Sequence, residues 1–147
     1  MTPKKKKTKK AKTAAESAAA AAAGTKVAVF DPAGGPLSAT ITSGQAQPGS
    51  YELLLWEANV NKVVMDERGN FLNPDDDTYE LPLPNTNNHG RIVECIATAV
   101  ITPPITNYAL RLSIQQDGVE IGVDEAADKA TAATVTADLF VQLLEAP

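Results

Sequence analysis

The alternation of apolar and polar residues is clearest between positions 108 and 123. Every second residue from Tyr108 to Ile114 is apolar, and polar residues or alanine stand between them. A repeat of two residues is typical of a β-strand with one face on a core and the other in water. Asp117-Gly118 tolerates the positive φ angles of a type I′ turn, and an apolar alternation resumes at Val119–Val123. The pattern therefore predicts a β-hairpin.

A two-residue loop at this turn also predicts the register of the two strands. Residues whose numbers add to 235 should face one another, as in four cross-strand pairs: Ile114 with Ile121, Leu112 with Val123, Gln115 with Glu120, and Arg111 with Asp124. The first two pairs lie on the apolar face, and the last is an expected ion pair on the wet face.

Seven further segments alternate in the same way and are bounded by Gly, Pro, Asn or Asp residues. They cover residues 27–29, 37–41, 51–56, 60–65, 78–83, 92–102 and 133–143. Residues 66–70 and 85–90 are expected to be a turn and a loop, and residues 124–132 are polar and small. About nine short strands predict an all-β chain folded as an antiparallel β-sandwich, and immunoglobulin-like and jelly-roll topologies both fit.

The charge is distributed very unevenly along the 147 residues. Residues 1–24 hold seven lysines and one glutamate, giving +6, whereas residues 25–147 carry a net charge of −11. The first 13 residues have almost no apolar side chain to bury, so we expect a disordered basic arm over 1–24 and a single domain over 25–147. The alanine-rich part of the arm favours a helix that forms on contact with a partner.

Two readings of location follow from these patterns. The alanine run is a poor hydrophobic region for a signal peptide, so an intracellular or virion location is expected more than secretion. No run approaches the roughly 20 apolar residues that span a bilayer, and no membrane contact is expected.

The sequence offers few residues that could form a catalytic or metal site. Cys95 lies on an apolar row and His89 in a polar loop, and one residue of each type cannot assemble a zinc site or a catalytic triad within the chain. The sharper hypothesis is a Ca²⁺ site in an acidic cluster on two adjacent turns, against which a solvated acidic loop is the plainer alternative. The cluster comprises Asp66, Glu67, Asp75, Asp76 and Asp77. No other cofactor is expected.

The lysines of the arm are the feature for which binding is best argued. Lysine acts as a point charge that neutralises phosphates without reading base sequence, so nucleic acid is a candidate partner. The alternatives are contact with the acidic domain or another copy, and an inert solubilising tail. The residues concerned are Lys4, Lys5, Lys6, Lys7, Lys9, Lys10 and Lys12.

A basic, alanine-containing arm followed by one β-sandwich is similar in layout to small viral coat proteins. That resemblance implies a non-enzymatic structural module that self-associates or joins a larger assembly. One alternative is a nucleic-acid-associated protein that binds through the arm. Another is an adhesion or carbohydrate-binding sandwich, which would need Trp56, Tyr51 and Tyr79 exposed together. Trp56 itself is expected at a sheet edge or between the layers, and an exposed aromatic that binds a partner is the sharper alternative.

Overall fold

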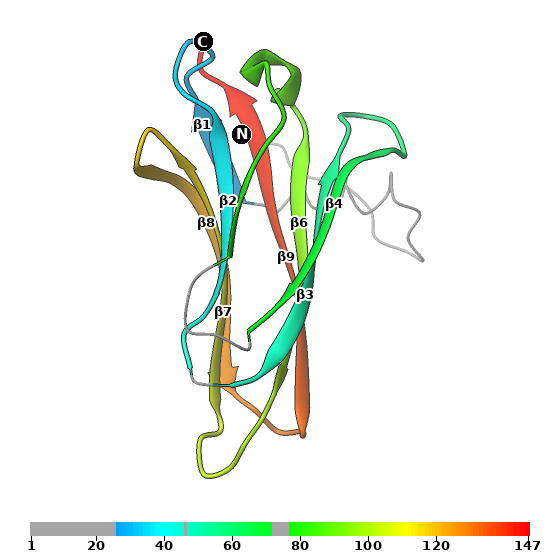
Figure 1. Ribbon diagram of the computed structural model, residues 1–147, viewed down its shortest axis with the longest axis vertical. Helices are drawn as coiled ribbons and strands as arrows, with labels where there is room; N and C mark the ends of the chain where they lie inside the picture. Colours follow the sequence, from blue (N-terminus) through cyan, green and yellow to red (C-terminus); the bar gives the residue numbers. More distant parts are fainter. Residues whose placement is uncertain (1–25, 46, 72–76) are drawn as a thin grey trace.

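The chain folds into two β-sheets packed face to face as a β-sandwich (Figure 1). The structure is a computed structural model that describes residues 26–45, 47–71 and 77–147. Figure 1 shows long strands running along the longest axis, with the turn after β7 and the turn after β3 on opposite sides of the view. The predicted all-β class is confirmed.

The first sheet has five strands in the order β1-β9-β6-β3-β4. β1 runs parallel to β9, and the other neighbours are antiparallel. The bounds are β1 Lys26–Phe30, β9 Thr134–Glu145, β6 Ile92–Val100, β3 Gly49–Trp56 and β4 Val63–Asn70.

The second sheet has four antiparallel strands in the order β5-β2-β7-β8. Its bounds are β5 Asp77–Glu80, β2 Leu37–Ser43, β7 Asn107–Gln116 and β8 Val119–Lys129. A short 3-10 helix, η1 (Asn85–Asn88), occupies part of the predicted asparagine-rich loop.

The core lies between the sheets and is built from the inward-facing alternate residues of both. On β3 these are Tyr51, Leu53 and Leu55, and on β7 they are Leu110, Leu112 and Ile114. Cys95 is also fully buried there, as the alternation of β6 predicted, and burial raises the pKa of its thiol to about 12. This cysteine is therefore a small apolar core residue.

The hairpin turn was predicted correctly, but the register beyond it was not. Asp117 and Gly118 have φ angles of 53° and 77°, as a type I′ turn requires, and Gln115 faces Glu120. Between Ile114 and Gln115 the register shifts by one residue, because Ile121 is an additional residue in β8.

Downstream of this β-bulge, the predicted pairs of Ile114 with Ile121 and of Leu112 with Val123 are wrong. Ile114 faces Gly122, and Leu112 faces Asp124. The predicted ion pair between Arg111 and Asp124 is also wrong, because the Arg111 guanidinium lies 3.0 Å from the carboxylate of Glu120. The bulge turns Gly122 inward, and a methyl group at that position would lie only 2.6 Å from Cβ of Ala28 on β1.

The predicted turn at residues 66–70 is wrong, and the polar segment after the hairpin also belongs to a strand. Residues 66–70 form the second half of β4, and residues 124–129 extend β8. Within the described ranges, both lie on strands that have a hydrogen-bonded neighbour on only one side, where charged residues can remain in water without disturbing the core. Their polar composition is therefore explained by the position of these strands at the edge of a sheet, and it does not indicate a turn.

Candidate functional site

The predicted binding residues of the arm are not placed by the structure. All seven lysines between Lys4 and Lys12 lie outside the described residues. Polyanion binding by the arm therefore stays a prediction.

The acidic cluster is placed only in part, because Asp75 and Asp76 also lie outside the described residues. Asp66 is on the outer face of β4, with its carboxylate 3.9 Å from the guanidinium of Arg68. Asp77 starts β5 and interacts with the Tyr51 hydroxyl between the sheets. Across the described ranges, no group of three or more His, Cys, Asp or Glu side chains is arranged to hold a metal ion. Asp66 and Asp77 therefore do not converge, and the full Ca²⁺ hypothesis stays a prediction.

Tyr51 and Tyr79 join the two sheets at this point. Their hydroxyl groups are hydrogen-bonded, and their rings meet edge to face with centroids 6.1 Å apart. Burial and the hydrogen bonds to Asp77 and Tyr79 raise the pKa of Tyr51 well above its usual value. The Tyr51 hydroxyl therefore stays protonated and acts as a structural link between the layers.

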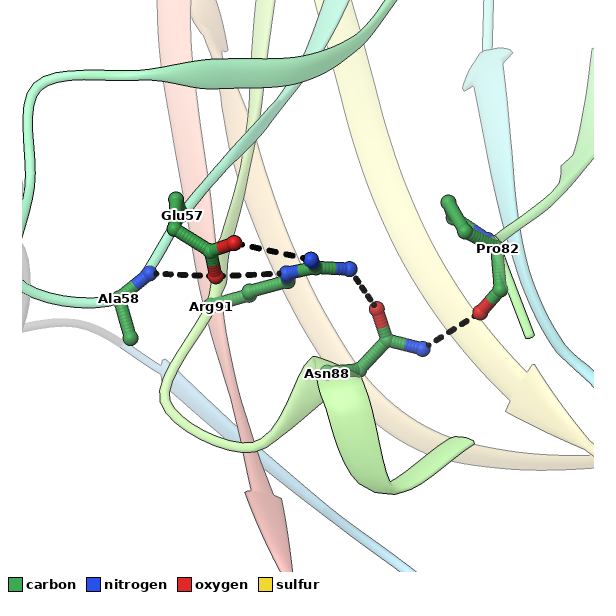
Figure 2. Close-up of polar contacts among 5 residues, drawn as sticks. All are labelled: Glu57, Ala58, Pro82, Asn88 and Arg91. Atoms are coloured by element: carbon green, nitrogen blue, oxygen red, sulfur yellow. Dashed lines mark hydrogen bonds and ion pairs between the residues drawn. The ribbon is translucent and has the colours of Figure 1, made fainter. Parts of the chain in front are cut away.

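The most elaborate polar network surrounds Arg91 at the start of β6 (Figure 2). Its Nε and Nη2 donate to the two carboxylate oxygens of Glu57 at 2.9 and 3.0 Å, and its Nη1 donates to Asn88 Oδ1 at 3.1 Å. Asn88 is fully buried and donates in turn to the carbonyl of Pro82 at 3.0 Å. The network thus ties the end of β3 to η1 and to the segment that follows β5.

The electrostatics of this network are those of a fixed ion pair. The hydrogen bonds from Arg91 and from the Ala58 N–H hold the pKa of Glu57 at about 2. Two parallel N–H···O bonds fix the guanidinium plane as well as its charge. The carboxylate accepts three hydrogen bonds, and the Asn88 amide both accepts one and donates one, so the network holds these segments of the fold together.

His89 is also engaged in the fold. Its Nδ1 accepts a hydrogen bond from the backbone N–H of Glu145 at 2.9 Å, which attaches η1 to the end of β9. Neither this contact nor the Arg91 network was predicted, because Glu57 and Arg91 are 34 positions apart and carry no local motif.

The largest unpredicted feature is a row of side chains on the outer face of the five-stranded sheet. The strand registers place Val27, Gln142, Ile92, Trp56 and Val63 side by side, one from each strand. Four of these five are apolar, although this face of the sheet is not covered by the second sheet. Such a row is unusual on the outside of a sandwich, where alternating polar residues are expected.

Apolar side chains above and below the row widen it into a larger apolar cluster, which we call the outer belt and in which the central Ile92 and Leu54 are buried. It comprises Val27 and Val29 of β1, Phe140 and Leu144 of β9, Ile92 of β6, Leu54 and Trp56 of β3, and Val63 of β4. Val27, Val29 and Val63 are exposed by 41%, 51% and 37%. The belt therefore offers exposed apolar area at both edges of the sheet.

A carboxylate lies inside the outer belt. Glu94 stands between Leu54 and Phe140 in the cross-strand register and is buried, and it accepts a hydrogen bond from Trp56 Nε1 at 2.8 Å. Trp56 is thus on the outer face of a central strand, and its predicted position at an edge or between the layers is wrong. The hydrogen bond fixes the indole against the sheet, which keeps its ring in the surface of the belt.

The aromatic residues required for an adhesion or carbohydrate site are not gathered on one surface. Tyr51 is buried between the sheets beside Tyr79, whereas Trp56 is on the opposite face of the same sheet. The arrangement does not provide the shared aromatic platform on which that hypothesis depended.

Comparisons with protein-family models, with curated protein sequences and with solved structures found no match. Within the described ranges, no helix is long and apolar enough to cross a membrane.

Proposed function

We propose that this chain is a non-enzymatic structural module. Its sandwich packs against further copies of the chain or into a larger particle, and its basic N-terminal segment serves as a tether. This is the role of a coat- or particle-type protein, in keeping with the layout of the sequence.

The outer belt is the observation that carries the proposal. Scattered apolar residues are normal on a protein surface, but a contiguous apolar patch is typical of a surface that meets another macromolecule. The belt crosses all five strands: Ile92 and Leu54 at its centre are buried, and the valines of β1 at its edge remain 41% and 51% exposed in the single chain. Each Å² of apolar surface removed from water contributes about 25 cal/mol, so covering the belt favours association.

The polar networks support a role without catalysis. The groups best suited to proton transfer, His89 and the Glu57–Arg91 pair, make hydrogen bonds that hold strands and η1 together. A thiol with a pKa near 12 is not a nucleophile at neutral pH.

Within the sandwich class, we propose that the fold is closer to the immunoglobulin-like type than to a jelly roll. The adjacent strands β3, β6 and β9 correspond in order to the C, F and G strands of that type, with β4 beside β3 as in variable domains. The β7–β8 hairpin, which separates β6 from β9 along the chain, is a departure from that pattern.

Val29→Lys tests the belt, and Val119→Lys is its matched control. Val29 is 51% exposed in the belt, and Val119 is 60% exposed at the β7–β8 turn of the other sheet. Both variants add the same charge at an exposed valine. We expect Val29→Lys to weaken self-association measured by sedimentation velocity, while Val119→Lys leaves it unchanged. Equal behaviour of the two variants would contradict a role for the belt.

Nucleic-acid binding through the arm is the second candidate function, favoured by the seven lysines between positions 4 and 12. The two functions are compatible, since the arm and the belt are separate parts of the chain.

A further inference from the structure

The first half of β9 has a free edge. β9 is 12 residues long, but β1 pairs only with its part from Val141 to Glu145. On the side away from β6, no strand in the described part of the chain pairs with the segment before Phe140. Among the residues that the structure describes, this segment therefore presents unpaired backbone groups at the side of the sheet.

The backbone hydrogen bonds at the C-terminal end of β9 show which residues face this edge. Leu143 N–H donates towards β6, to the carbonyl of Arg91, whereas Ala146 N–H donates towards β1, to the carbonyl of Phe30. Backbone groups alternate between the two sides of a strand, so the even-numbered residues face the free edge. They are Thr134, Thr136 and Asp138.

Where this edge meets the part of β9 that pairs with β1, a side chain accepts a backbone hydrogen bond. The backbone N–H of Phe140 donates to Oδ2 of Asp124 on β8 at 3.0 Å. The Phe140 N–H, which faces the same side as Thr136 and Asp138, is therefore already satisfied by a side chain of the second sheet.

The free edge also lacks the protection found on other edge strands. β4 carries adjacent charges at Asp66, Glu67 and Arg68, and β5, which has four residues in the described part of the chain, is soon followed by Pro82. Short length, charge and proline are the usual means of preventing edge pairing. By contrast, residues 134–139 (TVTADL) contain no proline or lysine and one carboxylate, and they are rich in residues that favour strands.

We propose that this edge of β9 pairs antiparallel with the same edge of a second copy, across a two-fold axis at Thr136. The inference rests on the proposed assembly function and gives it a second, distinct contact. Two five-stranded sheets become one continuous sheet, and the interface is isologous.

The register of this pairing follows from the positions of the free groups. With Thr136 opposite its equivalent, Asp138 faces the second copy's Thr134, and all three pairs join residues whose backbone groups point outwards. Three such pairs exchange about six hydrogen bonds. The two aspartates each face a threonine, so the pairing does not place like charges opposite one another.

Thr136→Lys tests the proposal, and Thr98→Lys is the matched control. The Oγ1 atoms of Thr98 and Thr136 are hydrogen-bonded at 2.9 Å across β6 and β9 on one exposed face. Either substitution removes this bond and adds the same charge to that face, but only Thr136 lies on the edge. We expect Thr136→Lys to weaken dimerisation of the full chain at least about tenfold, because two lysines meet at the axis, while Thr98→Lys changes it little.

Thr136→Pro is the second variant, since it removes an edge N–H that pairs with no described group and adds no charge. Sedimentation equilibrium of each full-length variant, with its melting curve, gives the result. If both Thr136 variants associate as strongly as the wild-type chain, the edge contact is overturned and the assembly proposal still stands. A monomeric wild-type chain at every concentration would overturn both. A monomer whose Thr136 and Asp138 amides exchange slowly with deuterium would show that the edge is covered from within the chain, and would also overturn the proposal.

Discussion

Gly122 of β8 packs directly against Ala28 of β1, where the two sheets approach at one side of the sandwich. The contact is so close that a methyl group on Gly122 would lie 2.6 Å from Cβ and 3.0 Å from Cα of Ala28. The bulge at Ile121 places the glycine there, because it brings Gly122 opposite the inward-facing Ile114.

Gly122→Ala is therefore expected to destabilise the domain by about 1–3 kcal/mol, the usual cost of overpacking a rigid contact. Ala28→Gly should restore part of this loss in the double variant, since it removes the methyl group that the new side chain meets. Urea unfolding of the four proteins measures the coupling. Additive effects in the cycle would show that the two residues are not in contact.

Acid sensitivity is expected from the Glu57–Arg91 pair. The pKa of Glu57 is lowered from 4.5 to about 2 in the folded chain, so its contribution to stability is fully present above about pH 4.5 and is lost as the pH falls towards 2. Glu57→Gln should remove this part of the pH dependence, and should lower stability at pH 7 by about 1–3 kcal/mol, because it leaves the Arg91 guanidinium poorly paired. Chemical unfolding at several pH values makes the measurement.

Arg68→Gln is the control for this prediction. Arg68 also forms an ion pair, with Glu52 at 3.0 Å, but its side chain is 74% exposed. Its loss should change stability by less than about 1 kcal/mol. Equal effects of the Glu57 and Arg68 substitutions would contradict the structural role assigned to the Arg91 network.

Leu112→Asp is expected to unfold the domain, while Arg111→Ser is expected to be mild. Leu112 is completely buried, and an unpaired buried carboxylate costs several kcal/mol of a domain stability of about 5–15 kcal/mol. Arg111 is 39% exposed in its pair with Glu120, which limits its contribution to about 1 kcal/mol. Circular dichroism melting curves distinguish the two, and similar melting temperatures would mean that the inward face of β7 is wrongly assigned.

The alternation of residues was sufficient to predict features that depend on one strand or one turn. The strand of Leu110, Leu112 and Ile114 and the turn at Asp117-Gly118 were predicted because local propensity and pattern agree there. The bulge at Ile121 could not be predicted, since the contact that it allows joins Gly122 of β8 to Ala28 of β1, which lie far apart along the chain.

The candidate surfaces escaped prediction for a related reason. Val27, Ile92, Trp56 and Val63 are unremarkable in their own segments, and they form a row only once the strand order and registers are known. The one local indication of an unusual outer face was Glu94, a carboxylate that stands between Ile92 and Ile96 on the outward row of β6.

Salt dependence tests the arm. If its lysines bind DNA by releasing condensed counterions, the logarithm of the binding constant should fall with the logarithm of salt at about −0.9 per phosphate neutralised on duplex DNA. With seven lysines not all engaged at once, we expect roughly four to six contacts and a slope of about −4 to −5. Removal of residues 1–24 should abolish binding, because the remaining chain has a charge of −11. Binding that survives this removal would contradict a role for the arm.

Self-association of the full chain is the central claim, and sedimentation velocity over a wide range of concentration tests it most directly. The outer belt and the free edge of β9 are separate contacts, so we expect species larger than a dimer at high concentration and physiological salt. Val29→Lys and Thr136→Lys should each reduce these species towards dimers, and the double variant should be monomeric. A wild-type chain that sediments as a monomer throughout would contradict the account.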